Sequence, residues 1–330
     1  MRVTYYQRKP RPGRLSIERV FDAVHSALPE RVRARIARSR FDRGVLRRAY
    51  NALEAAWRQG SINHVTGDIH YVALLLRKRR TVLTIHDCVG LNRLRGVRWF
   101  LLWLLWYWLP VKRAARVTVI SEASRRELLD VVRCDPAKIV VVHDPISSDF
   151  VHAPRPFHEK QPTILQVGTK ENKNLLRVAE ALRGIPCHLR IIGMLSPDQE
   201  HALREAEVDY SSVSGISDEA IVQEYRAADM LLFASTYEGF GLPIVEAQAT
   251  GRPVVTSNIC SMPEVAGDGA CLVDPHDVAS IRAGIVRVIN DRAYREELVA
   301  NGLRNVKRFT AEAIAGQYAA LYEEMIASVE

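Results

Sequence analysis

The chain has 330 residues, of which 48% are hydrophobic and 25% are charged, a balance that excludes a disordered polypeptide and is typical of a soluble globular protein. Its length exceeds that of one ordinary domain, so we expect two domains. Residues 1–150 carry 29 Lys and Arg against 13 Asp and Glu, whereas residues 151–330 carry 17 against 25. We therefore expect two domains with different partners, the basic half facing a lipid surface, a phosphate-bearing acceptor or nucleic acid.

The cysteines and the first residues of the chain indicate the cellular compartment in which the protein is expected. The five cysteines are scattered and form no C-x-x-C pair, which argues against a disulfide framework and against a zinc site. The opening segment, MRVTYYQRKPRPGR, does not have the pattern of a signal peptide. These features favour a protein of the reducing cytoplasm.

Short β-branched runs alternate with helical patterns along the whole chain. The runs are continuously apolar, which is typical of parallel strands buried on both faces. They lie at residues 3–6, 81–85, 116–121 and 138–143 in the first half, and at 163–168, 188–193, 230–235 and 253–257 in the second. This alternation predicts an α/β fold with one doubly wound, Rossmann-like domain in each half.

A proline-rich stretch indicates where the two domains meet. Residues 151–162, VHAPRPFHEKQP, contain three prolines and mixed polar side chains, a composition typical of a linker. The predicted organisation is a first domain over 1–152, a linker over 153–162 and a second domain over 163–310. A final helix over 311–330 could return to the first domain.

Ligands of open α/β sheets bind beyond the carboxyl ends of the strands, so residues that follow the predicted strands are candidate site residues. His86 comes directly after the run TVLTI, and Gly168 with Thr169 after TILQV. Glu238 follows MLLFAS at a short distance. His70, in the turn HVTGDIHY, is a further candidate for the acceptor side, with a buried structural histidine as the alternative.

An uncharged aromatic segment, WFLLWLLWYWLP at residues 99–110, holds four of the five tryptophans. The eleven residues before Pro110 are too few to span a bilayer, which needs about 20. Lys and Arg residues flank both ends. Since tryptophan favours the headgroup region and basic flanks favour anionic lipid, we predict a helix that contacts a membrane surface. The predicted contact residues are Trp99, Trp103, Trp106 and Trp108; a buried helix or a dimer interface is the alternative.

The segment STYEGFGLPIVEA, residues 235–247, surrounds a glycine loop with two carboxylates. Pro243 suits the first turn of a helix, and Gly251 suits the position just after its end. The glycines before the helix let the backbone approach a ligand, while the helix N-terminus favours an anion such as a diphosphate.

The two carboxylates are expected to bind different parts of one ligand. Glu246 lies in the first turns of the helix, where it could accept hydrogen bonds from two neighbouring hydroxyls, as acidic residues do with ribose. Glu238 lies across the glycine loop and would face the other end, where we expect a sugar.

At this point the chain resembles a known family. EGFGLPIVEA is similar to the E-x7-E motif of retaining GT-B glycosyltransferases of the family-4, or glycosyl transferases group 1, type. The similarity extends over 168–182 and 251–275, and in the first half over TIHD (84–87) and VISEASRREL (119–128). It implies two Rossmann-like domains that face each other across a cleft.

The resemblance, especially to bacterial enzymes of surface-polysaccharide assembly, also implies an activity. The chain would move a hexose-type sugar from a UDP- or GDP-linked donor to a glycolipid or saccharide acceptor. It would act in polysaccharide or lipopolysaccharide assembly, peripherally on the inner face of the cytoplasmic membrane.

Individual roles follow from the same resemblance. Lys173 would neutralise the diphosphate leaving group, Glu238 would contact the donor sugar, Glu246 the ribose, and His86 would line the sugar pocket. Further donor-binding residues are Gly168, Thr169, Lys170, Gly239, Phe240, Gly241 and Leu242, and Gly13 in the first loop would lie on the acceptor side. Because no D-x-D motif is present, we expect neither a metal nor another cofactor.

Two alternatives stay open. One is a GT-B nucleotide-sugar epimerase, which needs no membrane and would leave the aromatic segment unexplained. The other is a non-enzymatic protein that binds nucleic acid or a membrane through the arginine-rich stretch at 31–48, for which a basic amphipathic helix is an equal explanation. No nucleic-acid module accompanies that stretch, so no nucleic acid is expected as a partner. An oxidoreductase is disfavoured because no predicted strand is followed by G-x-G-x-x-G.

Overall fold

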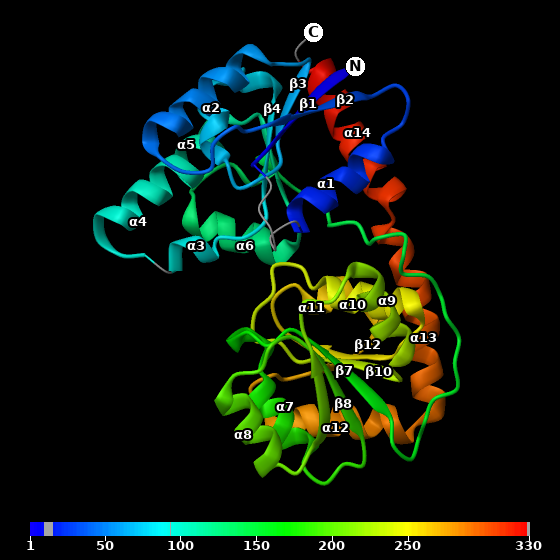
Figure 1. Ribbon diagram of the computed structural model, residues 1–330. Helices are drawn as coiled ribbons and strands as arrows, with labels where there is room; N and C mark the ends of the chain where they lie inside the picture. The colour runs from blue at the N-terminus through cyan, green and yellow to red at the C-terminus, as the bar shows by residue number, and fades with distance from the viewer. Residues whose placement is uncertain (10–15, 93, 329–330) are drawn as a thin grey trace. The chain divides into compact units, whose positions relative to one another are not determined.

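In the computed structural model, which describes residues 1–9, 16–92 and 94–328, the chain forms two α/β units. The first unit comprises Met1–Pro145 together with the chain from Ala311 onward, and the second comprises Ile146–Thr310. Each unit is a parallel sheet with helices on both faces (Figure 1). The predicted α/β class with a doubly wound sheet in each half is confirmed.

Within the described residues, the sheet of the first unit has six strands in the order β2-β1-β3-β4-β5-β6. The strands are β1 (Arg2–Gln7), β2 (Arg33–Arg38), β3 (Ile62–Val65), β4 (Thr81–Ile85), β5 (Arg116–Val119) and β6 (Ile139–Val141). Neighbouring strands are parallel throughout. The chain passes from β1 to β2 on one side and then to β3 on the other, so the strand order reverses between β1 and β3.

Strand β2 corrects the helical interpretation of the arginine-rich stretch at 31–48. Its sequence, RARIAR, lies at the edge of the sheet and pairs with β1 residue by residue, from Arg2 with Arg33 to Gln7 with Arg38. Its arginines are exposed, and its apolar residues are half-buried or buried. An edge strand tolerates this alternation of charged and apolar residues because one of its faces meets water.

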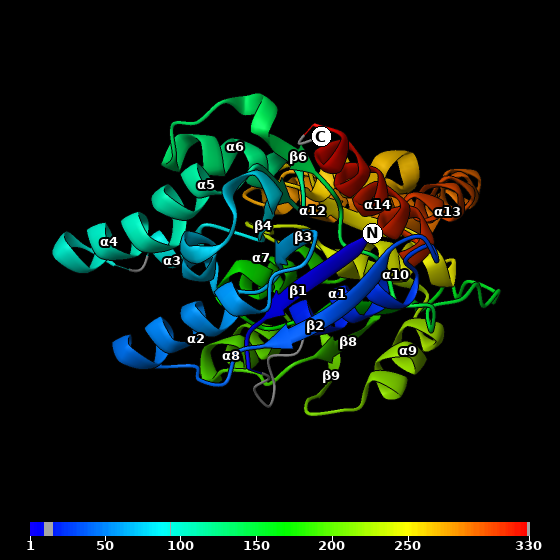
Figure 2. The same cartoon turned by 90° about the horizontal axis from the view of Figure 1, so that it is seen from above.

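Helices cover both faces of this first sheet. The α-helices are α1 (Ser16–Ser26), α2 (Val45–Trp57), α3 (Val89–Asn92), α4 (Gly96–Leu102), α5 (Leu109–Arg113), α6 (Glu122–Val131) and α14 (Ala311–Ala327). Short 3₁₀ turns lie at η1 (His70–Leu75), η2 (Lys78–Arg80) and η4 (Pro136–Lys138). Helices α1 and α14 lie on one side of the sheet, and α2 and α5 lie on the other (Figure 2). The apolar residues of α1 and α14 share one core cluster with Val3 and Tyr5, whereas those of α2, η1 and α5 share another with Tyr6.

A buried polar network ties α14 to the first sheet. The two ring nitrogens of His64 lie 2.6 Å from the hydroxyl of Tyr322 and 2.7 Å from the hydroxyl of Thr84. Tyr322 donates onward to the hydroxyl of Tyr5 at 3.0 Å. Burial lowers the pKa of His64 to about 3, with a smaller contribution from His86, so the imidazole is neutral.

The second unit also has a six-stranded parallel sheet among the described residues, in the order β12-β11-β10-β7-β8-β9. The strands are β7 (Thr163–Val167), β8 (His188–Ile192), β9 (Asp209–Val213), β10 (Met230–Phe233), β11 (Val254–Ser257) and β12 (Ala270–Val273). The chain builds one side of the sheet from β7 to β9 and then returns to β10 on the other side of β7. The order therefore reverses between β7 and β10.

The α-helices of this second unit are α7 (Leu175–Leu182), α8 (Pro197–Glu205), α9 (Asp218–Ala227), α10 (Leu242–Thr250), α11 (Met262–Ala266), α12 (Val278–Asn290) and α13 (Arg292–Asn305). Shorter 3₁₀ turns lie at η5 (Glu171–Lys173), η6 (Gly267–Gly269) and η7 (Val306–Phe309). Both predicted ends of α10 are confirmed, because Pro243 is its second residue and Gly251 follows its end with φ +78°.

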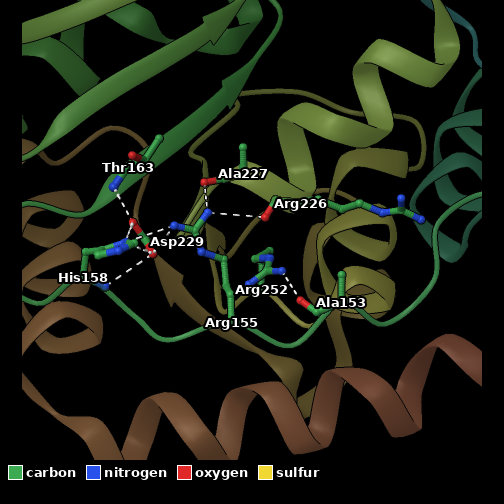
Figure 3. Close-up of polar contacts among 8 residues, drawn as sticks. All are labelled: Ala153, Arg155, His158, Thr163, Arg226, Ala227, Asp229 and Arg252. Carbon is green, nitrogen blue, oxygen red and sulfur yellow. Dashed lines mark hydrogen bonds and ion pairs between the residues drawn. The ribbon is translucent and has the colours of Figure 1, made fainter.

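The stretch expected to be a linker belongs to the second unit and is bonded to its sheet. Asp229, whose side chain is fully buried, accepts a hydrogen bond from the backbone of Thr163 at 2.8 Å and lies 3.0 Å from Nδ1 of His158 (Figure 3). Arg155 lies 3.5 Å from the same carboxylate and donates to the carbonyl of Ala227. Residues 155–158 are therefore held at the amino end of β10 rather than free.

Candidate functional site

The candidate site in the second unit lies at the point where its strand order reverses. Ligands bind at such a switch point in open α/β sheets, because the connections after two neighbouring strands diverge there. The connections after β7 and β10 contact each other through Asn172, whose backbone carbonyl accepts from the backbone N–H of Thr236 at 2.8 Å. The side-chain amide of Asn172 donates to the carbonyl of Tyr237 at 2.9 Å. Asn174 adds a hydrogen bond to the carbonyl of Ala234 at 3.0 Å.

This arrangement brings Lys173 and Glu238 together. Nζ of Lys173 lies 2.6 Å from Oε1 of Glu238, and each side chain is only 15% exposed. The ammonium also lies 4.4 Å from the ring centroid of Phe233, a cation–π distance, and the amide of Asn172 donates to the same carboxylate oxygen at 3.3 Å. A charged pair with so little access to water is fixed in place rather than solvated.

Gly168 makes room for the lysine. Its φ of +89° lies in the left-handed region, and a Cβ added there would be 3.0 Å from Cε of Lys173. The lysine backbone is fixed as well, because its carbonyl accepts from the side-chain amide of Gln166 at 3.0 Å. Residue 168 is therefore glycine both for its backbone conformation and for the space that Lys173 occupies.

The glycine loop leads into α10 as the sequence predicted. Gly241 is the N-cap residue with φ +108°, and Pro243 occupies the first turn. The buried hydroxyl of Ser261 lies 2.9 Å from the carbonyl of Glu238 and 2.7 Å from that of Phe240, which fixes the loop. The ring of Phe240 is buried and lies 5.6 Å from that of Phe309, so its side chain is packed in the core and is not available to a ligand.

Glu246 lies one turn into α10 and is only partly exposed. The hydroxyl of Tyr225 donates to its Oε2 at 2.5 Å. Burial raises the pKa of Glu246 to about 7, and the bond from Tyr225 and the charge of Lys173 only partly offset that rise. The carboxyl group therefore changes charge near neutral pH.

The other second-unit candidates frame this site. The hydroxyl of Thr169 donates to the carbonyl of Met194 at 2.7 Å, and its own carbonyl accepts from Gln199 at 2.7 Å, so Thr169 joins the connections after β7 and β8. Lys170 is exposed at the start of η5. Gly239 is half-buried in the loop, and Leu242 is half-buried at the start of α10.

In the first unit, His86 lies at the carboxyl end of β4, as expected from the sequence. It is half-buried, and its Nε2 lies 3.2 Å from the carbonyl of Thr66. Asp144, which the sequence interpretation missed, is buried after β6, and burial raises its pKa while His86 and His143 lower it. Two histidines therefore lie close enough to this acid at the carboxyl edge of the sheet to favour its charged form.

His70 and Gly13 are the two residues that were predicted to lie on the acceptor side. His70 is buried, with Nδ1 2.7 Å from the carbonyl of Trp106 and its ring 5.8 Å from that of Tyr107. Burial lowers its pKa. These contacts match the structural alternative for His70, with the ring packed against the aromatic helix. Gly13 lies outside the described residues.

The aromatic segment is helical from 96 to 113, with a π-helical stretch at η3 (Trp103–Trp108) between α4 and α5. Three of its four tryptophans pack against the core of the first unit. The indole N–H groups of Trp103 and Trp106 donate to the carbonyl of Val131 at 2.9 Å and to Asp68 at 3.1 Å. Trp103, Trp106 and Trp108 are therefore partly buried in the first unit, and Trp99 is 38% exposed. Contact of these four tryptophans with lipid stays a prediction.

Neither a metal cluster nor a membrane-spanning helix is found in the described part of the chain. Its His, Cys, Asp and Glu side chains form no group of three or more that could hold a metal ion. Across residues 1–9, 16–92 and 94–328, none of the helices combines the length and apolarity needed to cross a bilayer.

Comparison with known families gives matches along nearly the whole chain. The family described as glycosyl transferases group 1 matches residues 147–305, and the family described as glycosyltransferase family 4 matches residues 3–150. The two matches meet within a few residues of the boundary between the two units.

Similar proteins include two named as mannosyltransferases. The chain is 32% identical over 224 residues to O-antigen chain mannosyltransferase B of Escherichia coli, covering 60% of this chain and 58% of that protein. It is 31% identical over 273 residues to MMP alpha-(1->4)-mannosyltransferase of Mycolicibacterium hassiacum, covering 75% of this chain and 66% of that protein. The matches thus span about three fifths to two thirds of these relatives.

Solved structures show the same fold at low sequence identity. Sucrose-phosphate synthase from Thermosynechococcus elongatus aligns with a TM-score of 0.77 at 16% identity, covering 99% of each chain. HepE from Anabaena, solved with UDP and glucose, aligns with a TM-score of 0.75 at 16% identity, covering 98% of this chain and 100% of that one. This likeness assigns the GT-B fold type.

Proposed function

Since the chain belongs to the glycosyl transferases group 1, preceded by a glycosyltransferase family 4 region, we propose that it transfers a hexose from a nucleotide-sugar donor to a saccharide acceptor. The observation that carries this proposal is the pair of Lys173 and Glu238 at the switch point of the second sheet. One fixed cation and one fixed carboxylate lie beside a glycine loop and a helix N-terminus. Such a set suits a ligand with a diphosphate and a sugar.

Side chains and backbone groups of the chain itself can stabilise the negative charge that develops during the reaction. When the bond between the sugar and the diphosphate breaks, negative charge grows on the phosphate oxygens. Glu238 takes one of the three N–H groups of Lys173, and no other described side chain accepts from the ammonium. The remaining donors, together with the start of α10, stabilise that developing charge. Glu238 stays available to accept hydrogen bonds from sugar hydroxyls.

Glu246 supplies the nucleoside end of the site. Its carboxylate already accepts one hydroxyl, that of Tyr225, at 2.5 Å, and we propose that ribose hydroxyls add to or replace this contact. The proposed donor sugar is mannose, because the two relatives described above are named as mannosyltransferases. UDP and GDP are both candidates for the nucleotide, and HepE was solved with UDP.

The remaining features of the proposal follow the family expectation. The transfer retains the anomeric configuration and needs no metal, and the acceptor is a lipid-linked saccharide in polysaccharide or lipopolysaccharide assembly. For His86, at the carboxyl end of β4, we keep the sugar-positioning role that the resemblance implies. The enzyme works peripherally at a membrane, with donor chemistry in the second unit.

The test is a donor screen followed by a transfer assay. UDP- and GDP-linked glucose, galactose and mannose are first compared by thermal stabilisation of the chain, because a ligand that binds only the folded state raises its melting temperature. The stabilising donor is then incubated with lipid-linked saccharide acceptors, with and without EDTA, and release of nucleoside diphosphate is measured. Stabilisation and release by one donor support the proposal. A chain that no nucleotide sugar stabilises, and that releases no nucleoside diphosphate, would refute it.

A further inference from the structure

Helix α2 presents apolar side chains to solvent as well as to the core. Leu46 is 86% exposed, Leu53 56% and Trp57 92%, and Tyr50 lies between them on the same face. The buried residues of the helix, Asn51, Ala52 and Ala55, lie on the opposite face. We call the exposed set Leu46, Tyr50, Leu53 and Trp57 the outer stripe. A solvent-facing helix face is normally polar, so an apolar outer stripe indicates a surface that meets something other than water.

A basic pocket lies where α2 ends. It has a volume of about 400 Å³ and is lined by Gln59, Gly60 and other residues of the first unit. Its charged lining consists of Arg2, Arg33, Arg35, Arg77 and Arg80, and no carboxylate lines it. Trp57, the last residue of α2, precedes the lining residue Gln59 by two positions.

The arginines of this pocket lack negative partners. Arg2 and Arg33 are register partners on β1 and β2, and like charges at opposed positions of a sheet repel each other. Arg35 donates to the hydroxyl of Thr4 at 3.0 Å and to a backbone carbonyl, which are both neutral. Within the described chain, none of the five forms an ion pair with a carboxylate. Five uncompensated cations around one hollow favour an anionic ligand.

From these two features we propose that the first unit docks on an anionic bilayer through α2, with the arginine pocket holding lipid phosphate groups and the outer stripe entering the headgroup region. This docking surface goes beyond the proposed function. It depends on that function in one respect only: a transferase with a lipid-linked acceptor must reach a membrane. The exposed tip of α4, with Val97 74% and Phe100 49% exposed, projects on the same side of the first unit as α2 (Figures 1 and 2).

The combination of features selects lipid over the other occupants. Nucleic acid or free phosphate would use the arginines but would leave Leu46 and Trp57 in water. A second copy of the chain could cover the outer stripe, but a symmetric contact through this face would bring two arginine pockets toward each other. An anionic lipid surface supplies apolar and negatively charged groups together.

The test measures co-sedimentation of the full chain with vesicles, without any donor. Vesicles of phosphatidylcholine alone are compared with vesicles that also contain phosphatidylglycerol. One double variant removes the stripe (Leu46→Ser with Trp57→Ser), and another reduces the pocket charge (Arg33→Gln with Arg77→Gln). The control pair, Leu176→Ser with Arg204→Gln, changes residues of the second unit that are also exposed. Nucleotide-sugar stabilisation of each variant shows that it is folded and separates this inference from the donor site.

We expect the wild type and the control to bind only the vesicles that contain phosphatidylglycerol. The arginine variant should bind about 25-fold more weakly, since each basic residue near an anionic surface contributes roughly fivefold, and the stripe variant at least about 10-fold more weakly. The proposal would be overturned if the stripe variant bound these vesicles as tightly as the wild type. It would also be overturned if duplex DNA or inorganic phosphate abolished vesicle binding by the wild type and the stripe variant alike. A wild-type dimer in light scattering that the stripe variant converts to a monomer would overturn it as well.

Discussion

Nζ of Lys173 lies 2.6 Å from Oε1 of Glu238, although the two residues follow different strands and are 65 positions apart. The contact depends on the adjacency of β7 and β10, which brings the connection after each strand to one edge of the sheet. A lysine and a glutamate so placed hold each other ready for a ligand with both a diphosphate and hydroxyl groups.

Replacing Lys173 by Gln should lower turnover by roughly 10²- to 10³-fold, the range typical for loss of one group that stabilises developing negative charge. The matched control is Lys160→Gln, because Lys160 also belongs to the second unit but is exposed and precedes β7, so the change should alter turnover by about twofold or less. Nucleoside-diphosphate release at saturating donor measures both. Comparable losses in the two variants would show that Lys173 has no special role.

Replacing Gly168 by Ala should impair transfer by moving Lys173. The added Cβ would lie 3.0 Å from Cε of the lysine, so the ammonium must shift away from Glu238. Gly184→Ala is the control, since Gly184 also has a positive φ, +70°, but has no atom within 4 Å of an added Cβ. Both variants should lose about 1–2 kcal/mol of unfolding free energy to backbone strain. Only Gly168→Ala should also lose turnover, by at least about tenfold; equal turnover in the two would contradict this account.

Donor affinity should rise with pH because Glu246 must be ionised to accept ribose hydroxyls. With a pKa of about 7, the ionised fraction grows from roughly one tenth at pH 6 to nine tenths at pH 8, so the dissociation constant of the nucleotide sugar should fall about tenfold. Calorimetric titration measures it, and Glu246→Gln should bind weakly with no such pH dependence. A pH dependence that survives in the glutamine variant would assign the titration to another group.

His64→Ala should destabilise the first unit by about 2–4 kcal/mol. The change opens a cavity and leaves the buried hydroxyls of Tyr322 and Thr84 without their shared partner. Tyr322→Phe, which removes one of these hydroxyls, should be milder, at about 1–2 kcal/mol, in chemical denaturation. A tolerated alanine at position 64 would show that the network adds little.

The low pKa of His64 also sets an acid limit on the first unit. Because the folded pKa of about 3 lies below the ordinary value of 6.5, the stabilising contribution is present above pH 6.5 and is lost as the pH falls toward 3. The His64→Ala variant should show a weaker loss over that window than the wild type when unfolding free energy is measured by chemical denaturation. Equal pH slopes would mean that other groups dominate acid unfolding.

Much of the fold was predictable because buried parallel strands have a strong local signal. The runs at 81–85 and 163–168 become β4 and β7, and the helix start at Pro243 and its end at Gly251 are confirmed. The resemblance to glycosyl transferases group 1 is confirmed as well. Strand β2 was missed because its RARIAR sequence is highly charged, and only its edge position makes that sequence compatible with a strand.

The roles of single side chains were harder to predict, because they depend on contacts between distant segments. Tyr225 precedes Glu246 by 21 positions and has no motif that marks it as a partner of that carboxylate. The contacts of the aromatic segment at residues 99–110 could not be predicted from the sequence either. Its composition predicts an apolar helix but does not reveal that the indoles of Trp103 and Trp106 find hydrogen-bond partners within the first unit.

The return of α14 to the first unit has a consequence for biosynthesis. Residues such as Ile314, Tyr318 and Tyr322 complete the core around Val3 and Tyr5, yet the ribosome makes them after the entire second unit. The second unit can therefore fold while the first still waits for its last helix. During translation, β1 is made long before the helix that encloses it, so its apolar face stays open on the nascent chain and is a surface that a chaperone can protect.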